Sequence, residues 1–296
     1  MNALKNTVIL LRFPFSVYLL PVFLFAISQG SQLDIPKTIL VFIILHIIIY
    51  PSSNGYNSYI DQDTESIGGL EKPPIPPRLL FYVTWIMDAI GVVMSFLVIN
   101  VTFGTMVLGY VLASRAYSSK TIRLKQYPII SFLIVFLFQG GYTFIMVLAG
   151  STSMGILNIL DTPLVMAALV SSLMIGGGYP LTQIYQHDAD AENGDKTLSM
   201  LLNLKGTFLF SILLFVLAAI LLFVYFIGQQ NISHFLMFQL FITPLLVWFI
   251  VWMRRVWKNS EQANFKNTMT MNNISALCLN LFYGTLVIIN HIIEIS

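Results

Sequence analysis

Residues 38–65 read TILVFIILHIIIYPSSNGYNSYIDQDTE, a long apolar run that passes directly into a polar segment rich in acids. A run of this length has to be helical in a bilayer, because a backbone surrounded by hydrocarbon must satisfy its own hydrogen bonds. Acid or amide groups follow at Asn57, Asp61, Asp63 and Glu65. The stretch therefore predicts a membrane-spanning helix with its chemically useful groups at one end.

The composition extends this prediction to the whole chain. Hydrophobic residues make up 57% of the 296 residues and charged residues 9%, with a mean hydropathy of +0.81, whereas soluble domains are roughly 25% charged. A water-soluble fold is excluded. The net charge of +2 comes from scattered basic residues, which argues against a nucleic-acid partner. The single Cys278 has no partner for an intrachain disulfide.

Apolar runs bounded by polar, glycine or proline residues predict nine membrane-spanning helices, because one span needs about 20 apolar residues. The runs fall at 13–29, 38–60, 79–98, 101–118, 129–150, 163–187, 206–227, 235–253 and 273–293. We therefore expect an all-α integral membrane protein, one domain over residues 1–296, forming a single helical bundle. The fourth run, at 101–118, is among the short ones.

The basic residues predict the orientation of this bundle. A cytoplasmic N-terminus places every lysine and arginine except Lys37 on the cytoplasmic side, which is the distribution that membrane proteins follow. The long polar connections, 61–78, 119–128, 188–205 and 254–272, then share that side. We expect a multi-pass protein of a bacterial inner membrane, surrounded by lipid, with a central cavity that opens to the cytoplasmic side.

A second acidic cluster, YQHDADAENGDKT at residues 185–197, follows the sixth run. Helical spacing places Gln186 and Asp190 on one face and Asp188 and Glu192 on the next. The first cluster, extended to Glu71, and the second together hold eight of the thirteen acidic residues in the chain. Crowded carboxylates repel one another, so a cation should compensate them, and Mg²⁺ prefers such oxygen ligands together with substrate phosphates.

A basic segment, AYSSKTIRLKQYP at residues 116–128, lies between the acidic clusters and on the same predicted side. An anionic ligand held by Lys120, Arg123 and Lys125, and joined to the carboxylates through a metal ion, would account for both kinds of charge. A diphosphate fits this description. The simpler interpretation is that these cations only fix the membrane orientation.

These motifs resemble those of the UbiA-type intramembrane prenyltransferases. That family has nine transmembrane helices, a motif Asn-Asp-x-x-Asp-x-x-x-Asp after helix 2, and a motif Asp-x-x-x-Asp followed by Gly-x-x-Thr or Ser after helix 6. The corresponding segments here are NSYIDQDTE at 57–65 and QHDAD at 186–190, with Gly194 and Thr197 following. The chain departs from the pattern at Ser58, Glu65 and Gln186, which leaves the acceptor class open.

The resemblance implies Mg²⁺-dependent transfer of a prenyl group from an allylic isoprenoid diphosphate to a lipophilic acceptor, such as an aromatic compound or a quinone precursor. It implies metal ligation by Asn57, Asp61, Glu65, Asp188 and Asp190. Catalytic roles fall to Asp61, Asp188, Asp190 and Lys125. Diphosphate binding falls to Lys72, Tyr117, Lys120, Arg123 and Lys125.

Two other functions fit the residues. A terpene cyclase on the same scaffold would ionise the same substrate and close it on itself, and a transporter would use the acids as an ion site. Solvated helix ends would also account for the acids without any chemistry. Asp88 lies deep in the third run, where we expect an interhelical hydrogen bond. For His187 we favour a structural role beside the second motif.

Overall fold

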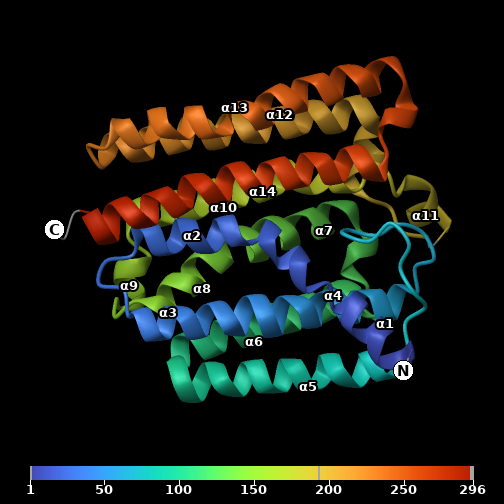
Figure 1. Ribbon diagram of the computed structural model, residues 1–296, viewed down its shortest axis with the longest axis horizontal. Helices are drawn as coiled ribbons and strands as arrows, with labels where there is room; N and C mark the ends of the chain where they lie inside the picture. The colour runs from blue at the N-terminus through green and yellow to red at the C-terminus, as the bar shows by residue number, and fades with distance from the viewer. Residues whose placement is uncertain (1, 193, 294–296) are drawn as a thin grey trace.

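The computed structural model describes residues 2–192 and 194–293, which form a bundle of long, roughly parallel helices (Figure 1). Within these residues the only extended pairing is at two isolated bridges. The α-helices are α1 Asn2–Leu11, α2 Leu20–Gln29, α3 Ile35–Phe42, α4 Tyr50–Asp61, α5 Arg78–Met94, α6 Val101–Ser118, α7 Pro128–Ile134, α8 Tyr142–Ser151, α9 Ile156–Ile159, α10 Thr162–Gly178, α11 His187–Glu192, α12 Leu198–Gly228, α13 Ile232–Lys258 and α14 Phe265–Ile288. Short 3₁₀ or π segments are η1 Phe13–Tyr18, η2 Ile43–Ile49, η3 Ser95–Ile99, η4 Leu124–Gln126, η5 Val135–Gly141, η6 Tyr179–Thr182, η7 Ser260–Gln262 and η8 Ile289–Ile293.

Continuous helical segments in the described part of the chain confirm the all-helical membrane fold. Seven of them are long and apolar enough to cross a membrane, and the bent segment from α1 to α2 makes up to eight. Helix α6, the short fourth run, falls outside that set and lies beside α5 in the bundle (Figure 1). Two connections are shorter than the expected 188–205 and 254–272. Helix α12 begins at Leu198, with a non-helical residue at Asn203 before the apolar run, and α13 continues to Lys258.

The first predicted run is broken rather than continuous. Helix α1 precedes it, and the chain bends by 44° between the segments Asn2–Tyr18 and Leu20–Gln29. Within the first of these segments, Arg12 adopts a left-handed conformation, with φ of 49°, where α1 ends and η1 begins. Pro14 and Pro21 lack the backbone N–H that a continuous helix would use. Arg12 directly follows α1, and its side chain contacts Gly68 at the polar end of the bundle.

A buried ion pair joins α4, α5 and α6. The Arg115 Nε donates to Asp88 Oδ2 at 2.7 Å, and its Nη2 donates to Ser52 Oγ on α4 at 3.2 Å. The guanidinium also lies 3.9 Å from the centroid of the Tyr56 ring. The expected interhelical hydrogen bond of Asp88 is therefore confirmed. Because unpaired charge is costly inside a membrane, this pair fixes the three helices relative to one another.

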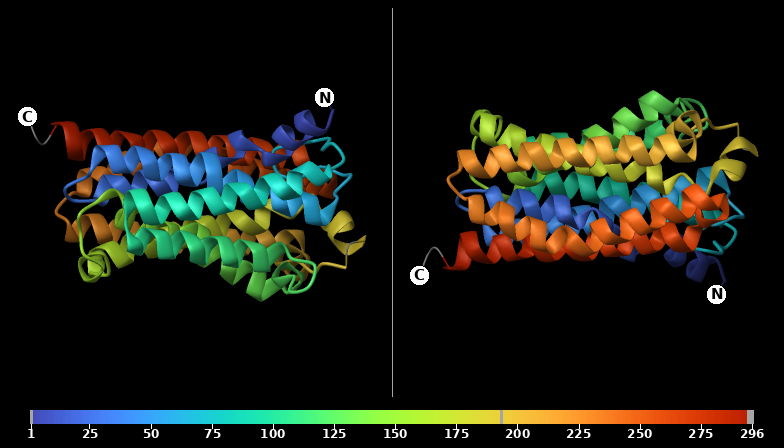
Figure 2. Two further views of the ribbon diagram at one scale, coloured as in Figure 1. Left: turned by 90° about the horizontal axis from the view of Figure 1, so that it is seen from below. Right: turned by 90° about the horizontal axis from the view of Figure 1, so that it is seen from above.

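The polar connections gather at one end of the bundle. Helix α1, the end of α4, the start of α7 and helix α11 lie at that end, whereas α14 finishes at the opposite end (Figures 1 and 2). Further contacts hold α4 against α6 toward this end, where Ser53 Oγ and Ser114 Oγ are 2.5 Å apart. The two acidic clusters, far apart in sequence, therefore share one region of the molecule.

Candidate active site

Two cavities with shared walls enter the bundle from the end that carries the acids. The outer cavity, of about 350 Å³, is lined by both acidic clusters and by Lys125. The inner cavity, of about 270 Å³, is lined mainly by aromatic, aliphatic and small polar residues. Ser53, Tyr110 and Tyr179 line both cavities. A ligand with a charged head and an apolar tail would match this division.

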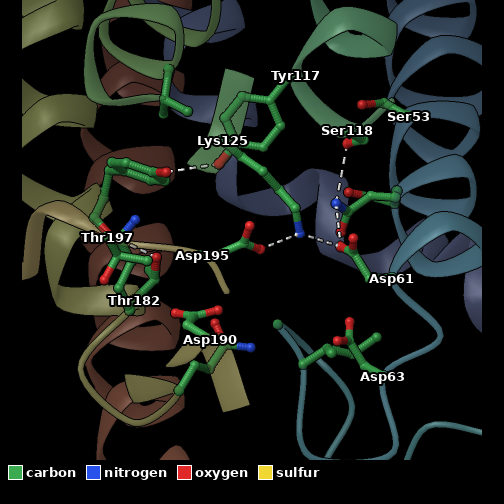
Figure 3. Close-up of a pocket in the computed structure, with 18 of the residues that line it drawn as sticks. Ser53, Asp61, Asp63, Tyr117, Ser118, Lys125, Thr182, Asp190, Asp195 and Thr197 are labelled. Atoms are coloured by element: carbon green, nitrogen blue, oxygen red, sulfur yellow. Dashed lines mark hydrogen bonds and ion pairs between the residues drawn. The ribbon is translucent and has the colours of Figure 1, made fainter. Parts of the chain in front are cut away.

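One wall of the outer cavity is the end of α4. The Asn57 amide donates to Asp61 Oδ2 at 2.8 Å and to Ser118 Oγ on α6 at 3.1 Å, which orients the Asp61 carboxylate (Figure 3). The helix ends there, because Gln62 adopts a left-handed conformation with φ of 56°. The i, i+4, i+8 spacing of Asn57, Asp61 and Glu65 would place them on one helix face only if the helix continued, and it does not. Glu65 lines the cavity from the following loop and is exposed.

Lys125 lies between the two walls. Its Nζ is 2.7 Å from Asp61 Oδ2 and 3.2 Å from Asp195 Oδ2 (Figure 3). Burial lowers the pKa of Lys125, but the neighbouring Asp61 and Asp195 carboxylates outweigh this effect and raise it. The ammonium group is therefore charged. Arg123 forms two hydrogen bonds with Asp195, at 2.8 and 3.0 Å, and does not line the cavity.

The opposite wall is formed by α11 and the loop that follows it. Asp190 and Gln186 both line the cavity, and the Asp190 N–H donates to the Gln186 carbonyl at 2.8 Å, as the predicted shared face requires. Asp188 precedes Asp190 by two residues, which corresponds to about 200° of rotation on a helix. Its side chain is therefore directed away from the cavity: it is exposed and lies outside the cavity lining. The Gln186 side chain donates to the Ser66 carbonyl at 3.1 Å and thus joins the two motif loops.

The Gly194-x-x-Thr197 pattern has a local structural role. Gly194 has φ of +74°, a conformation that glycine adopts without strain. Thr197 accepts a hydrogen bond from the Met200 N–H and caps α12. His187 lies beside this turn, with its Nε2 2.7 Å from Ser199 Oγ. These contacts set the path of the loop that carries Asp195.

The outer cavity carries more negative than positive charge. Among the described residues, six carboxyl groups line it against two basic side chains, Arg12 and Lys125. Burial raises the pKa of Asp63 to about 6 and that of Asp190 to about 7, with repulsion from other carboxylates adding to the effect. Neither group has an ion-pair partner among the described residues. Asp61 Oδ1 is buried and has no hydrogen-bond partner within the described chain. The arrangement favours an added cation.

Among the described residues, no three acid, imidazole or thiol groups already converge on one point. This agrees with the usual mode of Mg²⁺ binding, in which one or two carboxylates act together with substrate phosphates. Asp61 and Asp63 face Asp190 across the cavity (Figure 3). The donor set consists of oxygen atoms and therefore fits magnesium bridged to a diphosphate.

Most but not all of the residues singled out from the sequence come together here. Those that line the outer cavity are Asn57, Asp61, Glu65, Tyr117, Lys125 and Asp190. Those that do not are Lys72, Lys120, Arg123 and Asp188. Asp63, Asp195 and Arg12 also line the cavity, although neither the motifs nor the resemblance gave them a site role. An arginine beside an apolar run was a usable signal for Arg12.

Arg12 connects the first span to the first motif loop. Its Nη1 donates to the Gly68 carbonyl at 2.9 Å and its Nη2 to the Asn54 carbonyl at 3.1 Å.

Aromatic groups line the inner cavity. The Phe25 and Tyr283 rings stack with their centroids 4.5 Å apart. Tyr117 and Tyr179, whose hydroxyls are 2.7 Å apart, lie nearer the acids.

Solved structures share the fold. A structure of digeranylgeranylglyceryl phosphate synthase covers 97% of this chain and 98% of its own, with 22% identity and a TM-score of 0.60. A UbiA homologue from Archaeoglobus fulgidus bound to GPP and Mg²⁺ covers 95% of this chain and 99% of its own, with 16% identity and a TM-score of 0.67. The same homologue bound to DMAPP and Mg²⁺ has 15% identity over the same shares and a TM-score of 0.65.

No curated protein sequence matches the chain. The family model described as the UbiA prenyltransferase family matches residues 18–274. That range includes both acidic clusters, Lys125 and the helices that carry them. The chain therefore belongs to the UbiA prenyltransferase family.

Proposed function

We propose that the protein is a Mg²⁺-dependent prenyltransferase that transfers the prenyl group of an allylic isoprenoid diphosphate to a lipophilic acceptor. The observation that carries this proposal is the excess of carboxylates at the mouth of an apolar cavity. Family membership and the Mg²⁺-bound and diphosphate-bound homologues support it. The donor's charged head would lie in the outer cavity and its hydrocarbon in the inner cavity.

Asp61, Asp63 and Asp190 would hold the metal, with Asn57 orienting Asp61 through its 2.8 Å hydrogen bond. Glu65 and Glu192 line the same space but are exposed, so they have weaker roles. Bound Mg²⁺ would neutralise the diphosphate as negative charge grows on it. The exposed Asp188 is left out of this ligand set.

The protein's own residues then act on the two ends of the donor. Lys125, held between Asp61 and Asp195, would turn its ammonium group to the diphosphate and stabilise the leaving group. The bond between the first prenyl carbon and the diphosphate oxygen breaks, and the electron pair leaves with the diphosphate. The apolar inner cavity excludes water from the electron-poor carbon. The acceptor forms the new bond and releases one proton to solvent at the mouth.

Family membership and the seven long apolar helices make the chain a multi-pass integral membrane protein. We propose nine crossings, with α6 as the fourth, and the acid-bearing end in the cytoplasm of a bacterial inner membrane. A reporter fused after Ser296 should then read as external, while one inserted between Asp190 and Thr197 should read as cytoplasmic. Both reporters on one side would contradict the count.

Purified protein in detergent, incubated with an allylic diphosphate and an aromatic acceptor, tests the function. We expect release of inorganic diphosphate together with a prenylated acceptor, loss of both with EDTA, and recovery with Mg²⁺. Full turnover in chelator would contradict the metal role. Diphosphate release with a cyclised hydrocarbon and no need for acceptor would identify a terpene cyclase instead. Solute uptake into vesicles without any diphosphate release would identify a transporter.

A further inference from the structure

Three carboxamide side chains lie where the outer and inner cavities join. Asn54 on α4, Gln139 on η5 and Asn272 on α14 each line both cavities. Asn54 is seven residues before Asp61, so it lies about 10 Å deeper along the helix axis. These three residues, called here the amide collar, come from three different helical segments and line the space that the two cavities share.

The amide collar has little to bind within the protein. Among the described residues, the side chains of Asn54 and Gln139 form no hydrogen bond, and the Asn272 amide has only the Met269 sulfur at 4.0 Å. Amide groups at membrane depth are costly when they stay unpaired. All three are half-buried and reach the cavity space. A ligand that enters the cavity can satisfy them in place of water.

The backbone around Gln139 is also unusual. Gln139 lies on the π segment η5, and Gly140 next to it has φ of −95° and ψ of −109°. A Cβ atom on Gly140 would lie only 2.4 Å from the Ser172 Cα, so only glycine allows this close approach of α10. π segments and unusual backbone conformations concentrate at functional sites. Here they direct a glutamine into the cavity at the depth of the membrane.

The inner cavity contains nothing that would hold a charged group. Among the described residues, no acidic or basic side chain lines it. The excess carboxylates of the outer cavity lie just beyond the amide collar and would repel a second anion. Arg12, the basic side chain next to Asn54, already donates to the Gly68 and Asn54 carbonyls. An acceptor that carries a carboxylate or phosphate would therefore lose hydration, and it would have to displace these hydrogen bonds to gain an ion pair. An uncharged hydroxyl or carbonyl group would gain hydrogen bonds from the carboxamides.

We propose that the amide collar selects the acceptor, and that the acceptor has an uncharged head with hydroxyl or carbonyl oxygens attached to an apolar ring or chain. This inference rests on the proposed prenyl transfer and narrows its acceptor class. The acceptor's ring carbon or hydroxyl oxygen attacks the prenyl carbon as the diphosphate departs, and the acceptor loses one proton to solvent. The carboxamides hold the head so that the attacking atom faces the donor.

Two aromatic probes that differ by one carboxylate test the proposal. Naphthol and hydroxynaphthoate are titrated into the purified protein by their own fluorescence, with Mg²⁺ and inorganic diphosphate filling the outer cavity. We expect naphthol to bind at least about tenfold more tightly, which is the effect of one unpaired charge in a dry site. The kcat/KM for prenylation should show the same preference. Equal binding, or tighter binding of the carboxylate, would overturn the inference.

Substitution of the amides provides the second arm of the test. Gln139→Leu and Asn272→Leu should each raise the KM and Kd for naphthol about five- to tenfold, the scale of one lost hydrogen bond. The KM for the prenyl diphosphate should stay unchanged. Gln239→Leu is the matched control, because Gln239 lies on α13 and lines neither cavity.

Different results would contradict the proposed prenyl transfer and the proposed role of the amide collar. Binding that prefers naphthol and depends on Gln139, with no diphosphate released by any acceptor, would contradict the transfer reaction and leave the amide collar as a binding site. Transfer that proceeds normally in the Gln139→Leu and Asn272→Leu variants would contradict the amide collar and leave the reaction intact. Melting temperatures of all variants in the same detergent show whether a lost signal reflects unfolding.

Discussion

The pair Asp190 and Asp188 offers a sharp test of the candidate site, because the two carboxylates are two residues apart on α11 and differ in direction. Asp190 lines the outer cavity opposite Asp61, whereas Asp188 is exposed and outside it. Asn replaces either Asp with almost the same shape. We therefore compare Asp190→Asn with Asp188→Asn in diphosphate release and in the Mg²⁺ concentration that gives half-maximal rate.

The structure gives different magnitudes for the two changes. Losing one preorganised charge at the reacting centre lowers kcat by about 10²–10³, so Asp190→Asn should lower kcat at least about a hundredfold and weaken Mg²⁺ binding. An exposed charge one helix diameter away, about 10 Å, acts through water with about 0.4 kcal/mol. Asp188→Asn should therefore change the rate less than about threefold. Similar losses for both variants, or an inactive Asp188→Asn beside an active Asp190→Asn, would refute this orientation of α11.

Three further predictions follow from particular contacts. Asp88→Asn should destabilise the protein by about 3–5 kcal/mol, because it leaves Arg115 as an uncompensated buried charge. Thermal or denaturant unfolding in detergent measures this loss, and adding Arg115→Gln should restore part of the stability. The apparent Mg²⁺ affinity should fall as pH drops from about 8 to 6, because protons compete for the Asp190 carboxylate, whose pKa is raised to about 7; a pH-independent affinity by calorimetry would contradict this. Phe25→Leu should shift donor preference from geranyl toward geranylgeranyl diphosphate in competition assays, because Phe25 lines the inner cavity and a smaller side chain leaves more room there. Phe144 belongs to the same aromatic cluster but lies outside the lining, so Phe144→Leu should leave the preference unchanged.

The chain's own pattern was enough to establish a helical membrane protein with two acidic motifs at one end of the bundle. Twenty or so consecutive apolar residues leave a backbone few alternatives to a helix. Acids crowded after two such runs require a cation. Local spacing also predicted that Gln186 and Asp190 share a face, since a hydrogen bond between residues four apart depends only on helix geometry.

Tertiary structure decided which groups meet across the cavity. Whether α4 continued past Asp61 depended on one left-handed residue, Gln62, and its end there separated Glu65 from Asn57. The pairing of Arg123 with Asp195 and of Lys125 with Asp61 joins residues more than 60 positions apart. Such contacts follow from helix packing, which periodicity within one segment does not encode. For the same physical reason, only the folded bundle shows that Asn54, Gln139 and Asn272 line the same two cavities.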